Sequence, residues 1–262
     1  MADMAMLVVL LSYVVFILVD IFKPARKYEE VKNWRWVGMA ATLVLIPFNI
    51  ILSEVIAAQL KSANVTLLDL SALPVLPAAI GGWMLMTLIA YGFHRTFHRV
   101  QFLWRWTHQL HHSAERMDIF GAFYFHPNEI LVQASLSTLV LAILGFSPEQ
   151  AGVLGAISLF AAILQHANIN TPTWLAIFMQ RPEAHAVHHA RGVHAFNYSD
   201  FPLWDVLFGT FKNPKAYEAP AGFYLGSSYR VLDMLMGRDV GTPAKENSTE
   251  SAPEPGLARR AA

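Results

Sequence analysis

Residues 73–99 read LPVLPAAIGGWMLMTLIAYGFHRTFHR, and this stretch decides the class of fold. Its first 21 residues, 73–93, carry no charged side chain, which is long enough for one helix to cross the hydrocarbon layer of a membrane. His94 and His98 follow where such a helix would leave the lipid, four residues apart and therefore on one helical face. The stretch predicts a membrane helix that ends in two candidate metal ligands.

The composition of the whole chain supports this prediction. Of the 262 residues, 55% are apolar and only 15% are charged, whereas ordinary soluble domains carry about 25% charged residues. Four further apolar segments cover residues 4–22, 36–60, 130–146 and 151–165. The last two are short, so they are expected either to cross the membrane or to form a re-entrant hairpin around residues 145–150. We expect an all-α integral membrane protein with four to five membrane segments and a helical metal-binding cap at the inner face.

Charge and cysteine content exclude several classes of protein. The net charge is zero, so no basic footprint for nucleic acid is present. The absence of cysteine excludes a disulfide framework, a cysteine nucleophile and cysteine-ligated zinc or iron–sulfur sites. Histidine and carboxylate remain as the possible metal ligands.

The positions of lysine and arginine predict the orientation in the membrane. Of the 19 basic residues, 18 lie on the side that carries the histidines, and only Lys61 lies on the other. Because basic residues collect in cytoplasmic loops, we expect the N-terminus outside and the C-terminus inside. The first apolar segment lacks a basic region before it and a clear cleavage site, so it is interpreted as a membrane anchor rather than a signal peptide.

Three regions are expected along the chain. Residues 1–72 form N-terminal anchor helices, residues 73–215 form the catalytic domain, and residues 216–262 form a C-terminal extension. From about residue 239 the extension is rich in Gly, Pro, Ser, Thr and Glu, a composition typical of disorder.

The histidines are grouped rather than scattered. The sequence holds one HxxxH motif, two HxxHH motifs and a single histidine at the end of the segment 151–165. These are His94 and His98; His108, His111 and His112; His185, His188 and His189; and His166. Neutral imidazole binds iron, copper, zinc and nickel well, and nine such ligands suit two metals with four or five ligands each. His126 and His194 lie outside the motifs, and we leave their roles open.

Other kinds of metal protein fit the same residues less well. A zincin protease needs HExxH, but the first motif reads HRTFH. Soluble di-iron proteins use Glu-x-x-His pairs, which these motifs lack. A haem cytochrome would place its histidines within the membrane segments, and a metal transporter would line its crossing with polar residues.

Six strings that together cover about Leu85–Phe211, roughly half of the chain, resemble the fatty acid hydroxylase/sterol desaturase superfamily of membrane di-iron enzymes. They are YGFHRTFHR (91–99), LWRWTHQLHHS (103–113), FHPNE (125–129), QHANI (165–169), RPEAHAVHHARG (181–192) and FNYSDFPLWDVLFGTF (196–211). The resemblance implies two irons, O2 as co-substrate, and hydroxylation or desaturation of a lipid. It implies as iron ligands His94, His98, His108, His111, His112, His185, His188 and His189, with His166 as a ninth. Asn168 follows His166 in the family pattern, and the resemblance implies that it supports a ligand directly or through a water molecule.

Partners and alternatives follow from this interpretation. The carboxylates Glu115, Asp118, Glu129 and Glu183 are candidates for orienting imidazoles. No nucleotide or haem motif is visible, so electrons are expected from a separate ferredoxin, b-type cytochrome or reductase. Arg95, Arg99, Arg105 and Arg116 could dock such a donor, or could reflect only the charge bias of inner loops. The substrate is expected to be a fatty acyl chain, a sterol or a related apolar lipid. Lipid hydroxylase, lipid desaturase and a non-enzymatic metal-handling protein remain the three alternatives.

Overall fold

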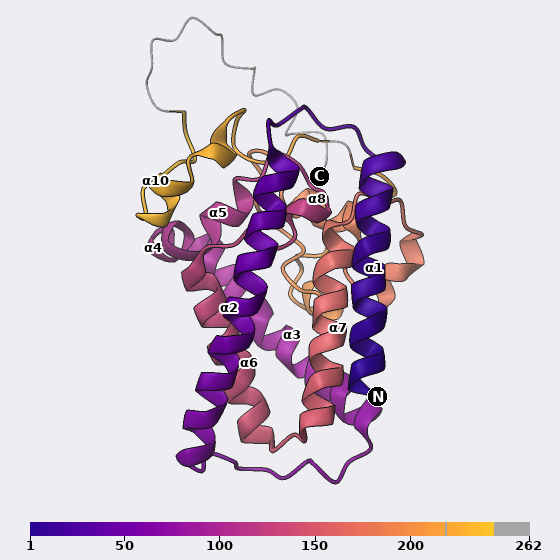
Figure 1. Cartoon of the computed structure of the whole chain (residues 1–262). Coiled ribbons are helices and arrows are strands. Elements are labelled where there is room, and N and C mark those ends of the chain that lie inside the picture. The colour runs from indigo at the N-terminus through magenta and orange to yellow at the C-terminus, as the bar shows by residue number, and fades with distance from the viewer. Residues whose placement is uncertain (218, 244–262) are drawn as a thin grey trace, which may run out of the picture.

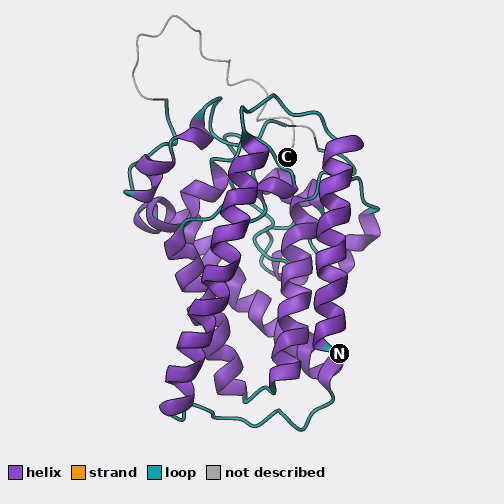
Figure 2. Cartoon of the chain, in the orientation of Figure 1, coloured by secondary structure: helices purple, strands orange, loops and turns teal. Residues whose placement is uncertain are grey.

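The computed structural model describes residues 1–217 and 219–243, and these residues are helical with no strand among them. The long helices pack into one bundle, as Figures 1 and 2 show. They are α1 (Ala2–Phe22), α2 (Trp34–Ser62), α3 (Val75–Arg99), α6 (Pro127–Leu144) and α7 (Pro148–His166). The expected all-α class is confirmed.

The long helices have the length and surface of membrane segments. α1, α2, α3 and α6 are long and apolar enough to cross a membrane, and α7 has 19 residues beside them. Large apolar side chains such as Leu11, Val14, Leu43 and Ile51 are exposed on α1 and α2. Side chains of this kind meet lipid in a membrane protein, because a soluble protein rarely exposes so much contiguous apolar surface. The four to five segments expected from the sequence are therefore present.

The segments at 130–146 and 151–165 form longer helices than expected, because each helix begins at an upstream proline. Pro127 and Pro148 occupy the first turns, where a missing backbone N–H costs nothing. Ser147 caps α7 in a capping box with Gln150. The amide of Gln150 also donates to the carbonyls of Leu70 and Leu73, so the α6–α7 turn lies at the same end of the bundle as the α2–α3 connection. The hairpin thus spans the whole bundle instead of turning back part-way.

Short helices form a cap at the opposite end of the bundle, where α4, α5, α8 and α10 are labelled in Figure 1. The cap elements are α4 (Gln101–Leu103), the π-helix η1 (Trp104–His108), α5 (Gln109–His112), η2 (Ile119–Gly121), α8 (Pro182–His188), η4 (Ser227–Tyr229) and α10 (Val231–Leu235). Two further short helices, η3 (Thr173–Ile177) and α9 (Leu203–Leu207), lie beside the long helices, where Trp204 of α9 donates to Thr87 of α3. A cluster of buried residues, among them Trp34, Ile119, Phe120 and Met234, packs the cap onto α1, α2 and α7.

Residues 219–243 are integrated into this cap. Met234 and Val240 are fully buried, and the Val240 backbone N–H donates to the side chain of Gln109 in α5 at 2.9 Å. The packed part of the chain therefore continues at least to Val240. The disorder expected from about residue 239 falls mainly on residues 244–262, which lie outside the described residues.

Candidate metal centre

The nine histidines expected to be ligands lie on four segments of the chain, and these segments meet where the bundle joins the cap. His94 and His98 occupy the last turns of α3, and His166 is the last residue of α7. The two HxxHH motifs lie on the η1–α5 segment and on α8 with the residue that follows it. Long packed helices thus hold three of these histidines in place, and the short cap helices bring the other six to them.

The helix that carries the first HxxHH motif contains a π-helical turn at Trp104–His108. Such wide turns are rare and occur frequently at functional sites. Here the turn places the Trp104 ring against two histidines, 5.0 Å from the His98 ring and 5.2 Å from the His112 ring between centroids. The tryptophan therefore closes one side of the cluster.

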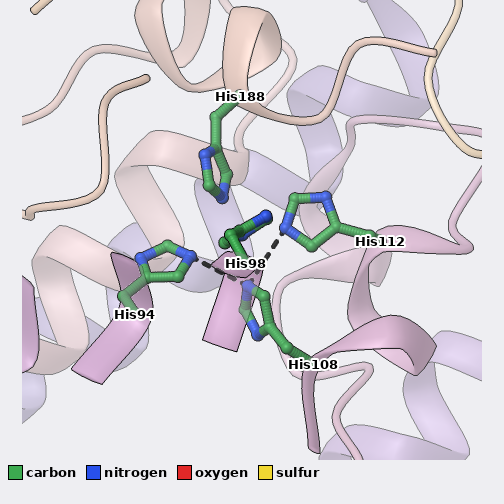
Figure 3. Close-up of side chains that lie close together, drawn as sticks. All are labelled: His94, His98, His108, His112 and His188. Atoms are coloured by element: carbon green, nitrogen blue, oxygen red, sulfur yellow. Dashed lines mark hydrogen bonds between the residues drawn. The ribbon is translucent and has the colours of Figure 1, made fainter. Parts of the chain in front are cut away.

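Five histidines form the first group, shown in Figure 3. His94, His98, His108, His112 and His188 each offer one ring nitrogen, and these nitrogens all lie within 4.8 Å of one another. The Nε2 atom of His108 lies 2.8 Å from Nε2 of His94 and 3.0 Å from Nε2 of His112. Since a metal–imidazole bond is about 2 Å long, opposite ligands of one ion lie about 4 Å apart, which is the scale of this group.

Four histidines form the second group. His111, His166, His185 and His189 also bring one nitrogen each within 4.8 Å of the others, and all four are buried. The Nε2 atoms of His111 and His166 lie 3.2 Å apart, and those of His185 and His189 lie 3.1 Å apart. The two groups are neighbours, because the ring of His112 in the first stacks on that of His189 in the second at 4.2 Å.

Each HxxHH motif is divided between the two groups. The first and last histidines of a motif, four residues apart, share one group, and the middle histidine belongs to the other. His108 and His112 are thus separated from His111, and His185 and His189 from His188. An HxxHH helix therefore does not direct all three imidazoles at one point. It contributes to both groups, because adjacent residues on a helix point about 100° apart.

Hydrogen bonds to the other ring nitrogen decide which nitrogen faces the group. In the first group, Nδ1–H of His94 donates to the Tyr198 carbonyl at 2.7 Å, and Nδ1–H of His188 donates to the Phe196 carbonyl at 2.8 Å. A neutral imidazole that donates through Nδ1 carries its lone pair on Nε2. Both residues therefore present a bare lone pair to the interior of the group.

These features fit a bound cation. The Nε2 atoms of His98 and His188 are buried and have no hydrogen-bond partner among the described residues. His94 and His108 both donate through Nδ1, so their Nε2 lone pairs face each other at 2.8 Å. Such lone pairs repel unless a positive ion lies between them. The residues present are therefore suited to hold metal ions.

Burial keeps the imidazoles neutral, which metal binding requires. Desolvation, with further repulsion from neighbouring imidazolium charge, holds the pKa of the six HxxHH histidines well below the ordinary value. They are His108, His111, His112, His185, His188 and His189.

The loop after α8 supports the first group. Its residues His194, Phe196 and Asn197 have positive φ angles of 40°, 68° and 48°, a conformation that costs free energy for residues other than glycine. The Asn197 side chain compensates by donating to the Ala184 carbonyl and by accepting from the Lys212 N–H. The strained loop is thereby held so that the carbonyls of Phe196 and Tyr198 reach the two histidines.

The WDxLFGT string, residues 204–210, stabilises the same loop through hydrogen bonds. Asp205 in α9 accepts hydrogen bonds from the N–H groups of Tyr198 and Ser199 and from the Thr210 hydroxyl. Burial raises the pKa of Asp205 to about 6. This aspartate positions the loop and does not contact a histidine.

The two remaining histidines have different surroundings. His126 caps α6, since its Nδ1 accepts from the Asn128 N–H at 3.0 Å. The Nδ1 of His194 lies 3.0 Å from Nδ1 of His112, so His194 touches the first group without belonging to it. Burial lowers the pKa of His194 to about 4.

Most of the residues expected to orient the imidazoles contact other parts of the protein instead. Asn168 holds Arg26 and accepts no histidine N–H; its own backbone N–H donates to Asp20. Glu115 accepts from Ser228, Asp118 from Trp34 and Arg116, and Glu183 from Thr171. Glu129 alone among the four carboxylates reaches an imidazole: its Oε1 accepts from His108 Nδ1 at 2.9 Å. The pairing depends on how α6 packs against η1, so no local pattern in the sequence indicates which carboxylate it involves.

Residues 79–210 match the family model for fatty acid hydroxylases, which is half of the chain. The chain belongs to this family. The matched region contains all nine histidines of the two groups and the WDxLFGT string.

Three curated relatives show the range of this fatty acid hydroxylase family. An ornithine lipid hydroxylase of Rhizobium tropici is 32% identical over 47% of this chain and 38% of its own length. A very-long-chain aldehyde decarbonylase of Oryza sativa subsp. japonica is 27% identical over 71% of this chain and 74% of the relative. Sphinganine C4-monooxygenase 1 of Arabidopsis thaliana is 27% identical over 46% of this chain and 48% of the relative. The chain thus spans less than half the length of the first and third relatives. No solved structure matches it.

Proposed function

We propose that the chain is a membrane oxygenase that uses two irons and O2 to hydroxylate a lipid. The observation that carries the proposal is the convergence of nine imidazoles into two adjacent groups at one end of a membrane bundle. The five-histidine group (His94, His98, His108, His112 and His188) would hold one iron. The four-histidine group (His111, His166, His185 and His189) would hold the other. Two of the curated relatives are named as lipid hydroxylating enzymes, which supports an oxidoreductase acting on membrane lipid.

Iron held by these histidines would supply the oxidising chemistry needed to activate O2 for attack on an unactivated C–H bond. The protein contributes a neutral, fully nitrogenous shell, because buried histidines are held in the uncharged form. It also excludes water, since seven of the nine histidines are buried and the other two are partly buried. The long helices fix His94, His98 and His166, so the positions of these ligands are set by packing and not by loops.

The location of the groups suits a substrate that stays in the bilayer. His94 directly follows Phe93, whose large apolar side chain is exposed on α3. A fatty acyl chain, a sterol or a related lipid could therefore reach the end of α3 without entering water. Lipids with a long linear hydrocarbon chain are favoured over sterols, because two relatives are named for ornithine lipid and sphinganine.

Hydroxylation of a C–H bond by O2 yields one alcohol and one water, and consumes two electrons and two protons. We propose that a separate donor, a ferredoxin, a b-type cytochrome or a reductase, delivers these electrons. Arg116 is paired with Asp118, and Arg95 donates to the Tyr91 hydroxyl. Arg105 donates only to the Gln101 carbonyl at 3.4 Å, and Arg99 makes no side-chain hydrogen bond among the described residues. These two are therefore the better candidates for docking an acidic donor.

The proposal is tested by metal content and by products. Protein purified anaerobically with iron supplied should hold about two irons per chain. Lipid extracted from cells that express the protein should gain hydroxylated species that carry label from 18O2. Products lighter by two hydrogens and without label would identify a desaturase instead. A content of one metal or none in intact, iron-replete protein would overturn the dinuclear centre, and product formation without O2 would overturn the oxygenase.

A further inference from the structure

The two histidine groups differ in what holds their outer nitrogens, the Nδ1 atoms that point away from each group. In the five-histidine group, Nδ1 of His94, His108 and His188 donate to oxygen atoms, and Nδ1 of His112 lies beside His194. In the four-histidine group only His166 donates, to the Ala162 carbonyl of its own helix. The Nδ1 atoms of the other three are buried without a hydrogen-bond partner among the described residues; they belong to His111, His185 and His189.

One of these outer contacts is made by a carboxyl group. Glu129 is the one carboxylate in the described part of the chain that lies within ion-pair distance of a histidine. Its side chain and that of His108 are each only 3% exposed. Glu129 Oε1 also accepts from the Gln133 amide at 3.1 Å, one turn further along α6. The carboxylate is therefore fixed from its own helix and directed at a histidine on another segment.

A carboxylate and a carbonyl do different things for an imidazole ligand. Both orient the ring, but the carboxylate also carries a negative charge that makes the imidazole more basic. Loss of such an outer partner typically costs about 10–100-fold in metal affinity. An imidazole whose Nδ1–H has no acceptor is neither oriented nor made more basic, and burial of the unpaired N–H costs free energy. In the five-histidine group, two carbonyls and one carboxyl group accept from the outer Nδ1–H groups. In the four-histidine group, a single carbonyl does so.

We infer that Glu129 is a positioning residue that makes the five-histidine group the tighter of the two metal positions, so that the chain loads its metals in order. The inference rests on the proposed dinuclear centre. Glu129 acts through His108 and touches no substrate, so its contribution is expected in metal affinity before it is expected in activity.

The test is a titration of metal-free protein in detergent with Co²⁺, whose visible absorption reports the number and type of ligands. The wild-type chain should bind two Co²⁺ in two steps, the first tighter. His185→Ala, in the four-histidine group, should remove the second step and leave the first. Glu129→Gln should weaken the first step about 10–100-fold and leave the second unchanged. Glu129→Asp, which keeps the charge, should recover part of the loss.

Glu115→Gln is the matched control. Glu115 is also a buried carboxylate of this end of the molecule, but it accepts only from the backbone and side chain of Ser228, so both steps should stay as in the wild type.

Gln133→Leu is a second variant in case Glu129→Gln does not fold. It removes the amide that holds the carboxylate and should weaken the first step by a smaller factor.

Two steps of equal affinity in the wild type, or equal weakening of both steps by Glu129→Gln, would overturn the ordered loading while the dinuclear centre stands. Binding of one Co²⁺ or none by the wild type at saturation would overturn the dinuclear centre and, with it, the inference.

Discussion

At the scale of single residues, the structure separates histidines that the sequence motifs treat alike. We expect His188→Ala and His112→Ala to lose the metal of the five-histidine group, and His185→Ala to lose that of the four-histidine group. His126→Ala should keep both metals and lose about 1 kcal/mol of stability, because His126 caps α6. Bound iron and thermal unfolding of the variants at matched expression check this. Loss of metal from His126→Ala but not from His188→Ala would contradict the assignment.

Asn197 permits a second test at this scale. The residue is buried, has a φ of 48°, and bonds through its side chain to Ala184 and Lys212. Asn197→Ala should destabilise the chain by about 2–4 kcal/mol, since it leaves buried polar groups unpaired in a left-handed conformation. Asn197→Gly relieves the backbone strain and should cost about 1 kcal/mol less. Denaturation in detergent measures the difference, and equal stability of the two variants would argue against strain in this loop.

At the scale of secondary-structure elements, α9 lies deep along a membrane helix. Trp204 Nε1–H donates to Thr87 Oγ1 at 3.0 Å, and Phe208 stacks on Tyr91 at 5.0 Å. Thr87 lies about 18 Å from the cap end of α3, at 1.5 Å per residue. Val206 and Leu207 are exposed there, as is Ile177 of η3, and a cavity of about 450 Å³ lies between the two elements. Both elements should therefore contact acyl chains.

The absence of cysteine makes this testable by single labels. A fluorophore at Leu207→Cys or Ile177→Cys should be quenched by nitroxide placed on lipid acyl chains. A label at Lys215→Cys, an exposed polar position of the cap, should be quenched much less. Equal quenching at the three positions would show that α9 and η3 do not enter the lipid.

At the scale of the whole molecule, the five long helices alternate in direction. The N-terminal amine lies near Glu149 at the end of the bundle away from the histidines, whereas Val240 packs against α5 in the cap. Because every lysine and arginine of the described residues except Lys61 lies toward the cap end, we expect the N-terminus outside and the cap inside. Reporters fused at Met1 and after residue 243 should give opposite outcomes. A C-terminal reporter on the outer side would contradict this orientation.

Part of the fold and of the site could be predicted from local sequence. A run of apolar residues long enough to cross a membrane forms a helix because every backbone group must be satisfied internally in lipid. The spacings within HxxxH and HxxHH cover about one helical turn, so they bring imidazoles together before any tertiary contact is made. The π-helical turn and the packing of residues 219–243 against α5 were not foreseen, since neither follows from hydropathy or short-range spacing.

The sequence by itself determined the membrane helices and the nine histidines that gather at their ends, because both depend on residues close together in the chain. Tertiary structure alone decided how those histidines divide into five and four, since the division depends on which helix faces which. It also decided that Glu129 reaches His108, and that the carbonyls of Phe196 and Tyr198 reach His188 and His94. The last contact joins residues 104 positions apart. Such contacts depend on packing and on a strained loop, so no local pattern records them.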